Sequence, residues 1–188
     1  MAYQQTALIV SNSEKFNLLA KRILADLKFT AVEIRKSAVS ARSELLGRSY
    51  NLIVVHAPLP DELGVDFVMD AKSKYSASVL LVLPNEIYDD VTDHVINHGV
   101  MTVQKPVSRI AITRCIKLLS AQQLEMKEAM QKINSLKEKM DEIRVVSKAK
   151  CLLIETRGMS EDEAHRYIGK QAMDNGVSRR KVAEEIIG

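Results

Sequence analysis

The residues from Ala149 to Ile187 read AKCLLIETRGMSEDEAHRYIGKQAMDNGVSRRKVAEEII, and this stretch determines how the C-terminal part of the chain folds. Gly158 and Gly176 each stand two residues before a serine. This spacing predicts that two helices end at the glycines and that the next two helices begin with the serines as N-caps. Apolar residues recur at helical spacing between these breaks, so each helix has one face to bury. The stretch therefore predicts a three-helix bundle.

Short motifs along the same residues are similar to those of a known module. They are Ala149-Lys150, the run from Arg157 to Ala164, Ala172-Met173-Asp174 and Val182-Ala183-Glu184, and the run includes a capping box between Ser160 and Glu163. At these positions the sequence resembles the ANTAR family, the RNA-binding output module of bacterial response regulators that act as transcription antiterminators. The resemblance implies binding to paired stem-loops in nascent leader RNA, which prevents an overlapping terminator hairpin from forming. Gly169 departs from a good helix sequence, at a cost of about 1 kcal/mol relative to Ala.

Basic residues of this module are the candidates for RNA contact. Residues 148–188 hold eight Lys and Arg against seven carboxylates, so the contact must come from local clustering rather than bulk charge. Arginine can fork onto phosphate or stack on an unpaired base, which favours Arg157 and Arg166 beside Lys150. The turn before Ser160 offers backbone donors at a helix start. The predicted RNA-binding residues are Ala149, Lys150, Arg157, Gly158, Ser160, His165, Arg166 and Lys170. A solvated, charged face is the competing interpretation.

Two other functions remain open for a short three-helix bundle. A DNA-binding response regulator of the helix-turn-helix type would use residues 178–187 as its recognition helix. That segment offers Arg179, Arg180 and Lys181 only in its first turn and then two glutamates. A protein–protein adaptor is the third possibility. Gel shifts with RNA hairpins and with duplex DNA distinguish the three.

Residues 7–107 alternate short apolar, β-prone runs with amphipathic helical patterns. This alternation predicts an α/β, flavodoxin-like domain, in which helices cover both faces of a five-stranded parallel sheet. The predicted strands are Ala7–Val10, Ala31–Ile34, Leu52–Val55, Val79–Leu83 and Val100–Val103, with helices over 16–27, 38–46, 65–74 and 87–97.

Pro60 and Gly64 after the third strand, with Lys105-Pro106 after the fifth, resemble the receiver domain of two-component response regulators. The resemblance implies an acidic pair that holds Mg²⁺ after the first strand, and an Asp at the end of the third strand that accepts phosphate. Here Ser11 and Asn12 occupy the positions of the pair and His56 that of the Asp. The resemblance also implies a Ser or Thr after the fourth strand, and this position falls at or beside Leu83-Pro84. Only Lys105 matches the pattern.

The chemistry of these residues argues against phosphorylation. A hard cation such as Mg²⁺ needs carboxylate oxygens, and the neutral Ser11 and Asn12 side chains are weak ligands. Without the metal, His56 lacks the charge compensation on which phosphoryl transfer depends. We therefore interpret Ser11, Asn12, His56 and Lys105 as a degenerate phosphorylation site, and the nearby Asp61 and Asp66 as solvated caps.

Residues 108–157 contain no Gly or Pro and carry a heptad pattern, which predicts one long helix. Such a helix must bury its apolar stripe, most economically against a second copy in a coiled coil, although packing within the chain is the alternative. Like charges at the positions that flank the heptad core leave open whether the two helices of the coiled coil run parallel or antiparallel. The predicted dimer seam contains Leu119, Met126, Ala129, Ile133, Leu136, Met140 and Ile143.

Composition limits the remaining possibilities. The chain has 188 residues, a net charge of +3 and two cysteines, and the charge neither requires nor excludes a nucleic-acid partner. Neither a secretory leader nor a membrane-spanning run is evident, so we expect a cytoplasmic protein. Scattered His and Ser residues predict no enzyme, no metal and no cofactor. We divide the chain into a receiver-like domain (1–110), a connector helix (111–147) and an RNA-binding bundle (148–188), with a homodimer and a regulatory protein as further expected partners.

Overall fold

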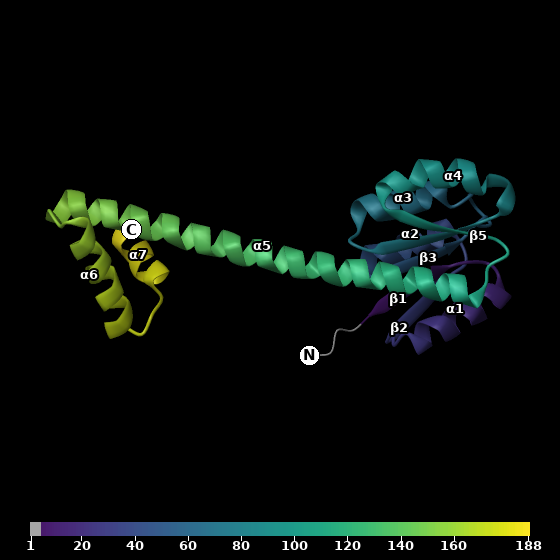
Figure 1. Ribbon diagram of the computed structural model, residues 1–188, viewed down its shortest axis with the longest axis horizontal. Coiled ribbons are helices and arrows are strands. Elements are labelled where there is room, and N and C mark those ends of the chain that lie inside the picture. The colour runs from purple at the N-terminus through teal and green to yellow at the C-terminus, as the bar shows by residue number, and fades with distance from the viewer. Residues whose placement is uncertain (1–4) are drawn as a thin grey trace. The chain divides into compact units, whose positions relative to one another are not determined.

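The computed structural model describes residues 5–188, which form two compact units that divide between Glu125 and Met126 (Figure 1). The N-terminal unit contains five strands and four α-helices, together with the first turns of the long helix α5. The strands are β1 (Thr6–Val10), β2 (Ala31–Arg35), β3 (Leu52–His56), β4 (Ser78–Leu83) and β5 (Val100–Gln104). The helices are α1 (Glu14–Asp26), α2 (Ala38–Gly47), α3 (Val65–Lys74), α4 (Tyr88–Val95), α5 (Arg109–Arg157), α6 (Glu161–Asp174) and α7 (Arg179–Ile187), with short 3₁₀ turns at Asn85–Ile87 and Ile96–His98.

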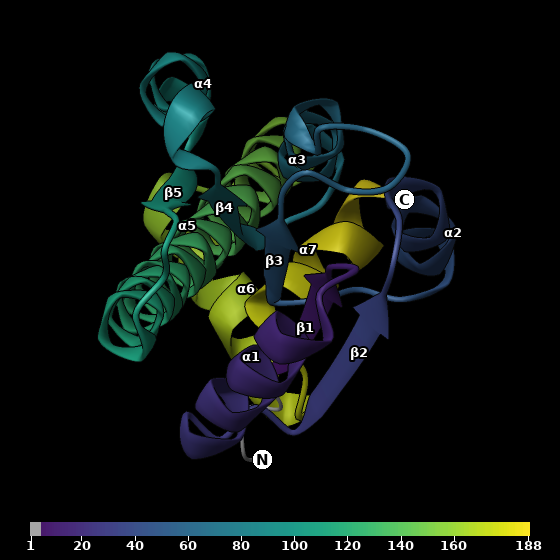
Figure 2. The same ribbon diagram turned by 90° about the vertical axis from the view of Figure 1, so that its right-hand side faces the viewer.

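The sheet is parallel throughout and has the order β2-β1-β3-β4-β5. The strands β1, β3 and β4 are almost fully buried because helices cover both faces, which explains why they read as continuous apolar runs. One core cluster lies under α2, α3 and α4, and the other lies under α1 and the start of α5. Figure 2 shows α1 on one side of the sheet and α2 and α3 on the other. The predicted α/β fold and its five strands are confirmed.

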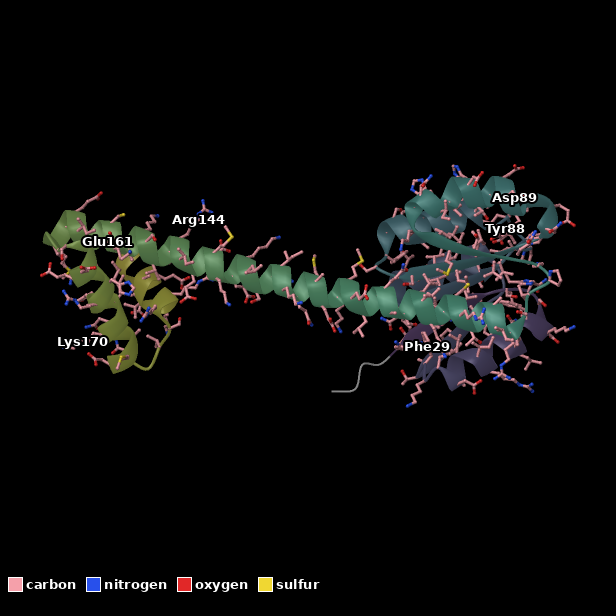
Figure 3. The ribbon with its side chains drawn as sticks, in the orientation of Figure 1. Phe29, Tyr88, Asp89, Arg144, Glu161 and Lys170 are labelled. Atoms are coloured by element: carbon pink, nitrogen blue, oxygen red, sulfur yellow. The ribbon has the colours of Figure 1, made fainter. Side chains whose placement is uncertain are left out.

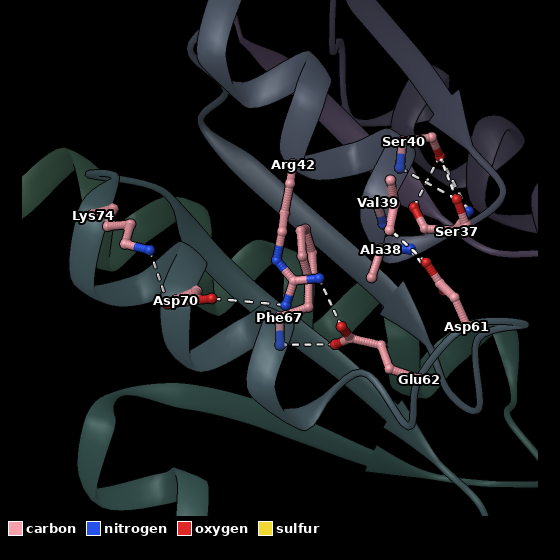
Figure 4. A network of polar contacts seen from close by, with 10 residues as sticks. All are labelled: Ser37, Ala38, Val39, Ser40, Arg42, Asp61, Glu62, Phe67, Asp70 and Lys74. Carbon is pink, nitrogen blue, oxygen red and sulfur yellow. Dashed lines mark hydrogen bonds and ion pairs between the residues drawn. The ribbon is translucent and has the colours of Figure 1, made fainter.

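The loop between β3 and α3 is held by two carboxylates (Figure 4). Asp61 accepts hydrogen bonds from the backbone N–H groups of Ala38 and Val39 at 3.0 and 2.9 Å, so it caps α2 from another element. Glu62 accepts from the Phe67 backbone N–H at 3.0 Å and from the Arg42 guanidinium at 2.6 Å. These contacts fix the loop that follows His56 and lower the pKa of Asp61, chiefly through the Val39 N–H.

The helix α5 is continuous over 49 residues, as the absence of Gly and Pro predicts. Its first turns pack on the sheet, where Ile112, Ile116 and Leu119 are buried. Leu119 is therefore part of the core of its own unit and is not available to the predicted dimer seam. This also places the start of α5 with the N-terminal unit, whereas our division assigned it to the connector. Residues 124–141 are all exposed.

In the C-terminal unit, α5 ends at Arg157 and two further helices follow. Gly158 and Gly176 both have φ of +63°, the left-handed conformation that glycine adopts at little cost. Ser160 forms the predicted capping box with Glu163, and Ser178 accepts a hydrogen bond from the Lys181 N–H. The three predicted helices are confirmed. Their core contains Ala149, Leu153, Ala164, Ile168, Ala172, Val182 and Ala183.

Candidate functional sites

A recess of about 520 Å³ lies where α5 turns into α6. The left-handed turn at Gly158 reverses the chain there, and the capping box of Ser160 starts α6. Because side chains three and four residues apart share one face of a helix, α6 presents a row of polar residues to the recess. Its lining consists of Arg157, Gly158, Met159, Glu163, Arg166, Tyr167 and Lys170. Four of the predicted RNA-binding residues therefore meet at one place.

Arg157 is held against Tyr167. Its guanidinium carbon lies 5.3 Å from the centroid of the Tyr167 ring, and its Nη1 donates a hydrogen bond to the Tyr167 hydroxyl at 3.1 Å. Both side chains keep part of their surface open to solvent, since Arg157 is exposed and Tyr167 is half-buried. Tyr167 packs against the core of the bundle and also contributes a polar edge to the recess, which its amphipathic side chain permits.

The carboxylate that lines the recess is engaged in hydrogen bonds, whereas the cations around it are exposed to solvent. Glu163 accepts from the Ser160 backbone N–H at 2.8 Å, so its carboxylate is occupied by capping, and this bond lowers its pKa. Arg166 donates from Nε to the Asp162 carbonyl at 3.3 Å. Lys170 is exposed toward the C-terminal end of α6 (Figure 3). The guanidinium groups and the Lys170 ammonium therefore outweigh one engaged carboxylate, which gives the recess a local positive character that bulk composition does not show.

The structure separates the other predicted residues from this recess. Ala149 is fully buried in the core of the bundle, so its side chain cannot contact RNA, and its inclusion among the RNA-binding residues is wrong. Lys150 pairs with Glu161 at 2.8 Å, its side chain is only 19% exposed, and its hydrogen bond lowers the pKa of Glu161. Ser160 uses its hydroxyl for capping, and His165 is exposed outside the recess.

The basic residues of α7 lie in its first turn, and one of them is paired within the helix. Arg180 in its first turn pairs with Glu184 one turn later at 2.8 Å. Arg179 lies near the backbone of Gly169, where an added methyl group would meet its guanidinium at 3.8 Å. Of the three basic residues that a recognition helix would need, Arg180 is therefore paired within α7, and Glu184 and Glu185 follow on the same short helix. This arrangement disfavours the helix-turn-helix alternative.

The four phosphorylation-site positions lie at one edge of the N-terminal sheet. Ser11, His56 and Lys105 follow or end β1, β3 and β5, whose carboxyl ends meet at the same edge because the strands are parallel. Ser11 is fully buried and accepts from the Ser13 N–H at 3.1 Å, whereas Asn12 is exposed. Lys105 donates from Nζ to the Ala57 carbonyl at 2.5 Å.

His56 is stacked on a neighbouring ring instead of facing open solvent. Its imidazole lies on Phe16 with ring centroids 4.3 Å apart and an interplanar angle of 26°. Burial lowers the pKa of His56 to about 4, and the nearby Lys105 ammonium adds to this effect. The imidazole is therefore neutral near pH 7. Sequence reasoning identified the position of His56 but not its partner Phe16, which lies 40 residues earlier on α1.

The depressed pKa of His56 predicts a specific loss of stability in acid. The unfolded chain binds a proton at His56 below about pH 6.5, whereas the folded chain does so only near pH 4. Stability from this group is therefore complete above about pH 6.5 and is lost as the pH falls toward 4, by about 1 to 2 kcal/mol at pH 4.5 once solvent screening of the half-buried ring is included. His56→Asn should remove this part of the loss.

Urea unfolding of the parent and of His56→Asn at pH 7.5 and pH 4.5 measures the effect, because loss common to both proteins cancels in the comparison. The exposed His98 offers a matched control, His98→Asn, which removes an imidazole away from the stack of His56 on Phe16. A parent and a His56→Asn variant with the same pH dependence would contradict the burial argument.

Comparisons with known proteins found similarities to both units of the chain. The family model of the ANTAR domain matches residues 134–187. The chain is 26% identical over 138 residues to the transcriptional regulatory protein PdtaR of Mycobacterium tuberculosis, a match that covers 73% of this chain and 67% of that protein. It is 32% identical over 93 residues to the aliphatic amidase regulator of Pseudomonas aeruginosa, which covers 48% of this chain and 45% of that regulator.

Solved structures resemble the N-terminal unit and show its fold. The signal receiver domain of an HD domain-containing protein from Pseudomonas fluorescens matches 68% of this chain and 95% of its own, with a TM-score of 0.60 and 18% identity. A CheY-like receiver domain from Methanospirillum hungatei matches 66% of this chain and 99% of its own, with a TM-score of 0.57 and 21% identity. Within the part of the chain that the structure describes, no helix is long and apolar enough to cross a membrane.

Proposed function

Since the chain is an ANTAR response regulator, with an ANTAR domain at residues 134–187 behind a receiver-type fold, we propose that it is an RNA-binding transcription antiterminator in the cytoplasm. ANTAR regulators bind RNA. The finer proposal is that this chain binds paired stem-loops in nascent leader RNA and so prevents an overlapping terminator hairpin from forming.

The observation that carries the proposal is the recess between α5 and α6. It brings Arg157, Arg166 and Lys170 together around the half-buried Tyr167, inside the segment that matches the family. Guanidinium groups contact phosphates and stack on bases, and an aromatic ring offers a second stacking surface. RNA loops present such unstacked bases, whereas the bases of a DNA duplex are stacked within the helix.

Titration of the 188-residue chain with an RNA of two adjacent stem-loops tests the proposal. The same sequence as duplex DNA is the control for bulk electrostatic attraction, because it carries phosphates without exposed loop bases. We expect the RNA to bind at least about ten times more tightly at physiological salt, equivalent to about 1.4 kcal/mol. Equal affinity for the duplex would instead support the DNA-binding alternative, and binding to neither would support the adaptor.

We further propose that the receiver-type domain is not a phosphoacceptor. Ser11, Asn12 and His56 stand where a receiver needs three carboxylates, and His56 is stacked on Phe16. Incubation with acetyl phosphate and Mg²⁺ should therefore leave the intact mass of the protein unchanged. A receiver domain with all three carboxylates, treated in parallel, shows that the donor is active. A stoichiometric adduct mapped to His56 would contradict this part of the proposal.

The exposed stripe of α5 supports a homodimer. Met126, Ile133, Met140 and Ile143 are between 47 and 78% exposed, and each lies three, four or seven residues from another member of the stripe. A single helix without packing is marginal in water, so a stripe of this length favours a partner helix. The proposed seam is Met126, Ala129, Ile133, Leu136, Met140 and Ile143. A receiver domain that is not phosphorylated needs another input, such as a protein that sequesters the dimer.

A further inference from the structure

A cavity of about 760 Å³ opens at the carboxyl edge of the sheet in the N-terminal unit. It is lined by His56 at the end of β3, by Phe16 and Leu19 of α1, and by residues that follow β4 and β5. In open parallel sheets, ligands bind outside the carboxyl ends of the strands, where the strand order reverses. In this sheet the order reverses between β1 and β3, next to His56. The cavity therefore lies where an α/β sheet places its ligand.

The lining suits a flat, apolar group. Phe16 is 4% exposed and its ring is stacked on His56, so the position of both rings is fixed. Leu19, Pro84 and Val107 add aliphatic surface around them. Small-molecule sites are largely apolar cavities of about 300 to 1,000 Å³ with a few polar groups that orient the ligand, and this cavity is within that range.

The polar group that orients a ligand here is Lys105. Lys105 is half-buried, and its ammonium donates to the Ala57 carbonyl. Among residues 5–188 it forms no ion pair with a carboxylate. One carboxylate, that of the exposed Glu86, also lines the cavity and acts on Lys105 through its charge without forming an ion pair with it. A second cation, Lys15, also lines the cavity. A partly buried ammonium without a contacting carboxylate favours an incoming anion, because a charge-assisted hydrogen bond would offset its desolvation.

We propose that this cavity binds a small organic anion with a flat apolar body, such as an aromatic carboxylate, whose anionic group pairs with Lys105 and whose ring packs against Phe16 and Leu19. The ligand takes the place of the phosphoryl group as the input to the domain. Pro106 and Val107, which line the cavity, lie between β5 and the first turn of α5. Occupancy therefore acts on the segment that leads into the long helix. The inference goes beyond RNA binding, and its test contains no RNA.

The test is a titration of the 188-residue chain with benzoate and phenyl phosphate, followed through the histidine ring signals by NMR. Benzamide is the matched neutral probe, since it has the shape of benzoate without the charge. We expect saturable binding of the anions at millimolar concentration or below, with shifts of the His56 signal, and about tenfold weaker binding of benzamide. Inorganic phosphate, which lacks the ring, should also bind more weakly than phenyl phosphate.

Two variants locate the site. Lys105→Met should weaken benzoate about tenfold and leave benzamide unchanged, because it removes the charge and keeps the length of the side chain. Lys21→Met removes an exposed cation of α1 outside the cavity and should change neither affinity. Leu19→Trp fills the cavity and should abolish binding of every probe, with circular dichroism confirming the fold.

Several results would overturn the inference. They are the absence of saturable binding by either anion up to about 20 mM, equal affinities of benzoate and benzamide for the parent, and undiminished binding by Leu19→Trp. Undiminished benzoate binding by Lys105→Met would remove the assigned anion partner. If Lys105→Met fails to fold, the benzoate–benzamide contrast and the Leu19→Trp variant still decide the matter. RNA binding by the parent is unaffected by any of these outcomes, so the two proposals fail separately.

Discussion

Replacing Arg157 by alanine should weaken binding of a stem-loop RNA by about five- to a hundredfold, since losing one arginine contact to a base costs about 1 to 3 kcal/mol. Arg157 is the residue that the recess orients best, through its contacts with the ring and the hydroxyl of Tyr167. A preoriented side chain loses less conformational entropy on binding. The bundle should still fold, because Arg157 is exposed and the core does not include it.

The comparison of variants separates phosphate contacts from base contacts. Arg166→Ala and Lys170→Ala should each flatten the dependence of log affinity on log salt by about 0.7 to 0.9 per lost phosphate contact. Tyr167→Phe keeps the stacking ring but removes the hydroxyl that holds Arg157, so it should cost part of the Arg157 effect. Lys117→Ala removes the same charge from an exposed site in the N-terminal unit and serves as the matched control.

Fluorescence anisotropy at several salt concentrations measures these affinities, with circular dichroism to confirm helix content. Lys150→Ala is expected to be less informative than the sequence implied, because its ammonium is paired with Glu161 and its side chain is mostly buried. If Arg157, Arg166 and Lys170 variants all fold and bind like the parent, the recess is a solvated face and the RNA site lies elsewhere.

Replacing Ile133 and Leu136 with lysine should convert a homodimer into a monomer at micromolar concentration. Burying each aliphatic side chain in a seam contributes about 1.5 to 3 kcal/mol, so the four in a dimer contribute about 6 to 12 kcal/mol. The four introduced charges add a desolvation cost unless they find partners. The monomer should also lose helix content, since residues 124–141 make no buried contact within their own chain.

Sedimentation velocity measures this change. The matched control is Gln131→Lys with Ser135→Lys, which adds the same charges at exposed positions outside the stripe and should leave the dimer intact. An unchanged dimer in the Ile133→Lys, Leu136→Lys variant would move the interface to the N-terminal unit. A parent that is monomeric without RNA would limit dimerisation to the RNA complex.

The local rules of the sequence determined most of the fold. Alternating apolar runs and helical patterns predicted the residue ranges of all five strands, because strand and helix periodicities depend on a few adjacent residues. Gly158, Gly176 and their serines fixed the ends of the C-terminal helices for the same reason: a left-handed turn and an N-cap are satisfied within a few residues of chain.

Only the tertiary structure decided which face of each element is covered, and by what. A heptad pattern marks Leu119 and Ile133 alike as apolar positions of α5, but the sheet buries the first and leaves the second 47% exposed. The burial of Ala149, the pairing of Lys150 with Glu161 and the stack of Phe16 on His56 join residues from different elements. Periodicity gives the direction of a side chain on its own helix or strand, whereas the neighbour it meets depends on how distant segments pack.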